Sequence, residues 1–139
     1  MSTLQRIANR PTWLLSRANA RSQALLADAF AGAGMRGYHF RVLAALEELG
    51  PASQADISRS TGIDTSDVVA AVNYLVEEGL VRRQPDAVDR RRNVVSITKR
   101  GLGAVERVGR VVDAVQDDVM APLSERERTT FLRLVAKLT

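Results

Sequence analysis

Two short helical patterns joined by a tight turn constrain the fold of this chain more than any other feature. Ser53 can cap a first helix, with Asp56 three residues further on, and Thr61-Gly62 closes that helix. Asp64 can cap a second, longer helix that ends by Gly79. The apolar positions of the second helix keep the 3.6-residue period at Val68, Ala71, Val72 and Leu75. Two helices joined by a three- to four-residue turn containing glycine are typical of a helix-turn-helix.

A basic segment follows the second helix directly. From Arg82 to Arg100 there are seven basic residues and two acidic ones, whereas the rest of the chain has 13 basic and 14 acidic residues. The β-prone runs Leu80–Arg83 and Asn93–Thr98 predict two strands around a polar tip that includes Pro85. A hairpin with such a local positive charge favours contact with a polyanion, and a solvated surface without a ligand is the alternative.

Amphipathic helices are predicted on both sides of this centre. One runs from Pro11 to Gly34, and a second from Arg36 to Gly50. After the hairpin, an apolar stripe of near-heptad spacing extends to Pro122, and a capping box at Ser124–Glu127 opens a last helix. Because these stripes must be buried, we expect a two-fold dimer in which the chain ends interleave; packing within one chain is the alternative.

The composition excludes several classes of protein. The chain has no cysteine and one histidine, His39, so disulfides, thiol redox sensing and multi-histidine metal sites are excluded. It also lacks the residue sets of a hydrolytic triad and a glycine-rich phosphate loop, so we expect neither an enzyme nor a cofactor. No apolar run approaches the roughly 18 residues that span a bilayer, and no signal-type stretch follows Met1. We therefore expect a cytoplasmic protein without a membrane partner.

Two short motifs complete the pattern. Asp89-Arg90-Arg91 stands at the hairpin tip, and Ser96-Ile97-Thr98-Lys99-Arg100-Gly101 follows it, both at the expected distance after Leu75–Val81. With the order of the elements, these motifs resemble the MarR family of winged-helix transcriptional regulators, from about residue 11 to the end of the chain. The resemblance implies a mainly α fold with a small β-hairpin wing. It assigns one domain to residues 1–139, with dimerisation helices at 11–34 and 101–139 around a winged helix-turn-helix at 36–100.

The same resemblance implies a function. Members of the family are homodimers that bind pseudo-palindromic double-stranded operators, with recognition helices in major grooves and wings in the flanking minor grooves. They mostly repress transcription, and many release DNA when a small, often phenolic or anionic, molecule binds. The alternative is a winged-helix module that binds protein and has no specific DNA binding.

Candidate wing contacts follow from the motif. By position, the family's wing arginine falls on Arg91 and its acidic partner on Asp89. A guanidinium can enter the narrow minor groove of A·T-rich DNA, and a carboxylate two residues away can fix its direction. The predicted wing residues are Asp89, Arg90, Arg91 and Arg92.

The predicted recognition helix offers an unusual set of side chains. Its outer face carries Thr65, Ser66, Val69, Ala70 and Asn73. The methyl groups can contact thymine methyls, and Asn73 can pair with an adenine edge. The family often has an arginine or similar residue near position 70, and this chain does not. Acidic residues near the helix start would repel phosphate, so Ser53 and Gln54 are expected to contact the DNA backbone.

An effector pocket is the least defined prediction. Family pockets open between the dimerisation region and the DNA-binding unit, which places Tyr38 and His39 of the second helix near such a pocket. Trp13 and Arg17 of the first helix could face them. A packing role for His39 is the alternative.

Overall fold

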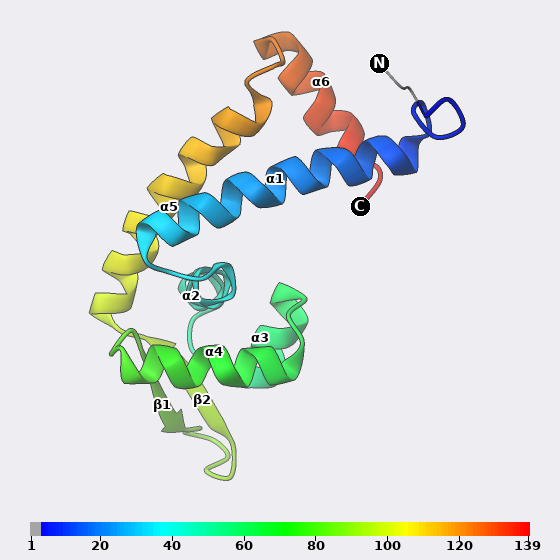
Figure 1. Cartoon of the computed structure of the whole chain (residues 1–139). Helices are drawn as coiled ribbons and strands as arrows, with labels where there is room; N and C mark the ends of the chain where they lie inside the picture. Colours follow the sequence, from blue (N-terminus) through cyan, green and yellow to red (C-terminus); the bar gives the residue numbers. More distant parts are fainter. Residues whose placement is uncertain (1–3) are drawn as a thin grey trace.

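The computed structural model describes residues 4–139, so the first three residues of the predicted domain lie outside the described part (Figure 1). It contains six helices and two strands within these residues. The elements are α1 (Pro11–Ala33), α2 (Gly37–Leu49), α3 (Gln54–Thr61), α4 (Thr65–Glu77), β1 (Val81–Pro85), β2 (Asn93–Ile97), α5 (Lys99–Met120) and α6 (Glu125–Ala136). The predicted fold class, mainly helical with a β-hairpin wing, is confirmed.

Side-chain caps set the starts of four helices. The capping residues are Ser53 on α3, Asp64 on α4, Thr98 on α5 and Ser124 on α6. At Ser124 the predicted capping box is complete, because Glu127 also accepts a hydrogen bond from the Ser124 N–H at 2.9 Å. Each cap satisfies a backbone N–H that has no partner inside its helix. At the other end of α3, Gly62 adopts a left-handed φ of 72°, which allows the tight turn into α4.

The hairpin is shifted from its predicted position. β1 begins at Val81 rather than Leu80 and includes Pro85, which we expected in the tip and which pairs instead with Asn93. Proline is tolerated there because the sheet has only two strands, so the end of β1 is an edge position. β2 ends at Ile97, and Thr98 caps the next helix instead of continuing the strand.

One hydrophobic core fills the space between α2, α3, α4, the hairpin and the first half of α5. We call the region from α2 to β2 the winged unit. The four inner positions predicted for α4 are all buried. The core also includes Val105 and Val108 of α5. The predicted boundary between residues 100 and 101 therefore falls in the first turn of a helix that packs on the winged unit.

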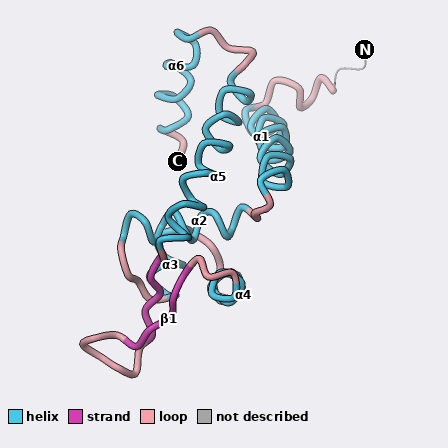
Figure 2. The backbone as a smooth tube through the Cα atoms, turned by 90° about the vertical axis from the view of Figure 1, so that its left-hand side faces the viewer, coloured by secondary structure: helices cyan, strands magenta, loops and turns pink. Residues whose placement is uncertain are grey.

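Helices α1 and α5 run antiparallel and form the part of the molecule opposite the hairpin (Figures 1 and 2). Arg21 of α1 donates hydrogen bonds to the carbonyls of Asp118 and Val119 at the end of α5, at 2.8 and 2.7 Å. In return, Arg107 of α5 donates to the carbonyl of Ala33 at the end of α1, at 3.3 Å. Cations at carbonyl ends of helices are favourable, so these contacts hold the two helices side by side, with an arginine of each at the carbonyl end of the other.

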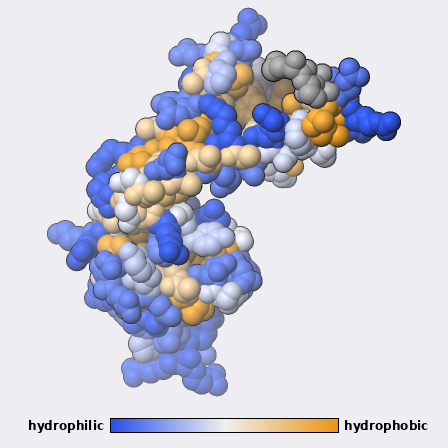
Figure 3. Space-filling view, in the orientation of Figure 1, coloured by the Kyte–Doolittle hydropathy of each residue, from blue (hydrophilic) through white to orange (hydrophobic). Residues whose placement is uncertain are grey.

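The outer helices leave apolar surface uncovered. Neither α1 nor α6 has a buried residue. Large exposed apolar side chains lie on these helices at Leu14, Leu15, Phe131, Leu132 and Leu134. Figure 3 shows an apolar band along the upper part of the molecule and a hydrophilic hairpin end. A single chain therefore does not bury the faces that the sequence pattern requires to be buried.

Gly101 allows α5 to pack closely against the hairpin, which gives a stability prediction. A Cβ at this position would collide with the carbonyl oxygen of Leu80 and would lie 2.7 Å from Cγ1 of Ile97. We expect Gly101→Ala to lower the free energy of unfolding by about 2 kcal/mol or more. Gly103→Ala is the matched control, because its Cβ would meet nothing within 4 Å; it should raise stability by about 0.5–1 kcal/mol. Thermal and urea melts check both values, and equal melting temperatures for the two variants would contradict the packing argument.

Candidate nucleic-acid interface

The outer face of α4 and the hairpin lie at the same end of the molecule (Figure 1). Of the predicted base-reading residues, four are exposed and Val69 is partly buried. The structure therefore places all five on the accessible side of α4, because the opposite face of the same helix is in the core; Ala70 lies at the edge of this side and also lines the cavity described below. They are Thr65, Ser66, Val69, Ala70 and Asn73. Asp64 bonds to Ser66 N at 3.2 Å as the helix cap, which accounts for one of the acidic groups near the helix start.

Arg83 of β1 contacts this face, and the sequence pattern did not identify it. Its Nη2 donates a hydrogen bond to Oδ1 of Asn73 at 2.7 Å and lies 3.5 Å from Oε1 of Gln54. Three elements, β1, α4 and α3, thus meet at one guanidinium. The alternation of side chains along a strand predicts that Arg82 and Arg83 point to opposite faces of the hairpin. It does not indicate which of the two faces α4.

The wing tip holds Arg91 in a defined position. Nε of Arg91 lies 3.1 Å from Oδ1 of Asp89, and the same oxygen accepts a hydrogen bond from the Arg91 backbone N–H at 3.1 Å. The hydrogen bonds from Arg91 hold the pKa of Asp89 below its ordinary value, so the carboxylate stays ionised at neutral pH. The expected pairing of these two residues is confirmed. The Arg91 side chain itself is 91% exposed, so its guanidinium can reach another molecule.

The remaining predicted contacts divide between exposed and buried positions. Arg90 is exposed, and Arg92 is exposed with Nη2 3.9 Å from Oδ2 of Asp56 on α3. Gln54 is half-buried beside Arg83. The structure differs from the prediction at Ser53. This residue is buried, and its hydroxyl accepts a hydrogen bond from the Asp56 N–H as the cap of α3. Its side chain is therefore not available to contact the DNA backbone.

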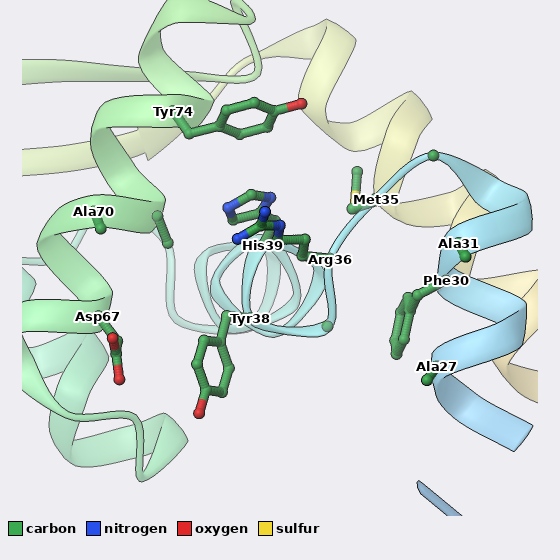
Figure 4. Close-up of a pocket in the computed structure, with 13 residues that line it drawn as sticks. Ala27, Phe30, Ala31, Met35, Arg36, Tyr38, His39, Asp67, Ala70 and Tyr74 are labelled. Carbon is green, nitrogen blue, oxygen red and sulfur yellow. The ribbon is translucent and has the colours of Figure 1, made fainter. Parts of the chain in front are cut away.

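A cavity of about 920 Å³ lies between α1, α2 and α4 (Figure 4). Tyr38 and His39 line it, as expected. Trp13 and Arg17 do not; instead, the Arg17 guanidinium stacks over the Trp13 ring at 5.7 Å, nearer the start of α1. The side chains that line the cavity and were not predicted include Ala27, Phe30, Met35, Arg36, Asp67 and Tyr74. They come from three separate segments, so no single motif marks them.

The His39 side chain lines this cavity and packs against an aromatic ring. Its ring stacks on Tyr74 of α4, with centroids 4.3 Å apart and planes 12° from parallel. Its buried Nδ1 has no hydrogen-bond partner among the described residues. Burial, and secondarily the charge of Arg36, lowers the pKa of His39 below its ordinary value. The ring is therefore neutral at pH 7, and one ring nitrogen is available to accept a hydrogen bond.

Within residues 4–139, no helix is both long and apolar enough to cross a membrane. The same residues contain no group of three or more acidic or histidine side chains placed to hold a metal ion.

Comparison with known proteins points to one family. Residues 33–92 match the MarR family. The HTH-type transcriptional repressor NicR of Pseudomonas putida is 28% identical over 125 residues, which are 90% of this chain and 79% of that protein. The crystal structure of a probable transcriptional regulator from Pseudomonas aeruginosa is 30% identical, with a TM-score of 0.84 over 94% of this chain and 98% of that one. BpsR of Bordetella bronchiseptica, whose DNA binding is regulated by 6-hydroxynicotinic acid, is 26% identical, with a TM-score of 0.85 over 95% and 94% of the two chains.

Proposed function

Because the chain belongs to the MarR family of winged-helix transcriptional regulators, we propose that it acts in the cytoplasm as a homodimeric repressor of a pseudo-palindromic operator. This family consists of regulators and not of enzymes. The observation that carries the proposal is the common location of the α4 outer face and the paired Arg91 at one end of the molecule. A helix and a basic hairpin placed side by side match adjacent major and minor grooves of DNA.

Each part of the interface has a distinct role in this proposal. The outer face of α4 contacts base edges, where the methyl groups of Thr65 and Val69 suit thymine. Arg91 enters the minor groove, and its bond to Asp89 keeps it extended toward that groove. Arg90 and Arg92 neutralise phosphates and position the wing without reading sequence.

The uncovered helices support the proposed dimer. Large apolar side chains of α1 and α6 stay exposed in the single chain, and a second copy related by a two-fold axis presents the same faces to cover them. Two copies would also place two α4 helices on one duplex, which is why the operator is expected to be pseudo-palindromic.

Selection from a random pool of DNA duplexes by the purified protein tests this proposal. A recovered inverted repeat, bound with strong salt dependence, is the expected result. Recovery of no common sequence, with weak binding to any duplex, would instead favour a winged-helix module that binds protein.

The cavity suits a small hydroxylated aromatic acid as effector. Arg36 can pair with a carboxylate, and the Tyr38 and Tyr74 rings can contact an aromatic face; the His39 ring lines the same space. A relative regulated by 6-hydroxynicotinic acid supports this class. Because Asp67, Ala70 and Tyr74 belong to α4, an occupant touches the recognition helix directly. It would release DNA by favouring an α4 position that does not fit the grooves.

We predict that Arg36→Gln weakens binding of 6-hydroxynicotinic acid about tenfold or more, because a hydrogen bond to a charged group is lost. Arg41→Gln is the matched control, since Arg41 lies on α2, just after the Arg36 cap, and outside the cavity, over the Tyr38 ring at 5.6 Å. Calorimetric titration measures both variants, and the acid should lower operator affinity of the wild type. Equal affinity of the two variants for the acid would contradict a role for Arg36.

A further inference from the structure

We propose that Arg83 determines base specificity by fixing the side-chain amide of Asn73 as a hydrogen-bond donor, so that each half-site is read at guanine and not at adenine. This inference rests on the proposed function and concerns one position of the operator. Neither the wing motif nor the recognition-helix pattern includes Arg83.

The chemistry of the guanidinium decides the orientation of the amide. Arginine has only N–H donors, so the atom of Asn73 that lies 2.7 Å from its Nη2 must be the oxygen. The amide nitrogen of Asn73 then points to the other side of the carboxamide. Gln54 follows the same rule at 3.5 Å, where its Oε1 is the nearer atom. Both amides therefore turn their oxygens toward Arg83.

What remains for DNA is a set of donors. Among residues 4–139, neither Nδ2 of Asn73 nor Nε2 of Gln54 donates to a protein acceptor, and the guanidinium has further N–H groups. All three residues come from the DNA-facing side of α3, α4 and β1. A cluster whose free groups are mainly donors, because each amide oxygen already accepts from a cation, matches the guanine edge, which presents the two acceptors N7 and O6 in the major groove.

Adenine is disfavoured by the same geometry. A bidentate asparagine–adenine pair needs the amide oxygen to accept from the adenine N6 amino group. In this structure that oxygen already accepts from Arg83 at 2.7 Å. Adenine would have to share it, and the adenine N6–H donor would then stand beside the positive guanidinium, which disfavours the pair. The sequence-based expectation that Asn73 reads adenine would hold for an Asn73 without this neighbour.

Base preference of the wild type and of Arg83→Met tests the inference. The wild type, on its selected operator, should prefer guanine over adenine by roughly tenfold at one position of each half-site. Replacing that guanine with 2-aminopurine, which keeps N7 but lacks the O6 acceptor that distinguishes guanine from adenine, should remove most of this preference. Arg83→Met removes the guanidinium and keeps an unbranched side chain. The Asn73 oxygen can then accept a hydrogen bond from adenine N6 without a cation beside it, so the preference should move to adenine.

Arg82→Met is the matched control. Arg82 is the neighbouring exposed arginine on β1, where it pairs with Ser96, and adjacent strand residues point to opposite faces. The Arg82→Met variant loses the same charge, so its affinity for the operator should fall with no change in base preference. Asn73→Ala gives a second measurement, because it should abolish the guanine preference without creating one for adenine.

The outcomes separate this inference from the proposed function. A guanine preference that changes to adenine only in Arg83→Met supports the inference. Tight operator binding with adenine preferred by the wild type, or with the same preference in wild type and Arg83→Met, overturns the inference and leaves the proposed function standing. Failure of the wild type to select any duplex overturns both.

Discussion

Replacing Arg91 with alanine should weaken operator binding by on the order of 100-fold, about tenfold for each wing of the dimer, because a hydrogen bond to a charged group is lost at each minor groove. The salt dependence should fall as well. At about 0.9 per phosphate neutralised, loss of two cationic contacts lowers the log-log slope by roughly two. Gel shifts at several salt concentrations measure both quantities.

The fold should be unaffected by this change. The Arg91 side chain is 91% exposed and, among residues 4–139, pairs only with Asp89 in the tip of the wing; such surface pairs contribute little to stability. Asp89→Ala should produce a milder loss of binding, because the arginine keeps its charge and loses only its fixed direction. Wild-type affinity and salt slope in Arg91→Ala would exclude the wing from the groove and would favour the protein-binding alternative.

The second large effect is expected at the uncovered apolar surface formed by α6 and the residues just after its end. Leu134 and Leu138 are 47% and 71% exposed in the single chain. Replacing both with glutamate would place two charges in the proposed interface, where desolvation of each unpaired charge costs several kcal/mol. We expect a monomer at micromolar concentration by light scattering. Operator binding should be lost with the dimer, because one protomer contacts only one half-site.

A matched control tests whether the loss of the dimer is specific to charges on the apolar face. Thr129→Glu with Arg133→Glu introduces two glutamates at exposed positions on the polar side of α6, so this variant should remain a dimer with wild-type operator affinity. Circular dichroism should show the helical fold in both variants, since the core of the winged unit contains no residue of α6. A monomeric wild type that binds operator tightly would exclude the proposed dimer.

Local chemistry allowed much of this protein to be predicted from sequence. The caps at Ser53, Asp64, Thr98 and Ser124 act on N–H groups two or three residues away, so the residue types alone locate the helix starts. The buried positions of α4 follow from one helical period. The ion pair between Asp89 and Arg91 also spans only two residues, within a single turn.

Contacts between distant segments required the tertiary structure. Ser53 has the residue type of a phosphate contact, yet the short bridge between Ala52 and Val95 draws this segment against β2 and buries it. The cavity combines the end of α1, the start of α2 and one side of α4, and the crossing of these helices leaves Trp13 and Arg17 outside it. Periodicity places a residue on a face of its helix but does not state how far along that helix a neighbour crosses.

The contact between Asn73 and Arg83 shows most clearly what the sequence determines and what only the tertiary structure decides. By itself, the sequence determined that Asn73 lies on the outer face of the recognition helix, because the inner face is fixed by the apolar period. Only the tertiary structure decided which hydrogen-bonding atoms Asn73 can offer, because the register of β1 beside α4 places Arg83 at its oxygen. Side-chain hydrogen bonds depend on ångström-scale placement across elements, and that placement is set by packing of the whole core rather than by any local pattern.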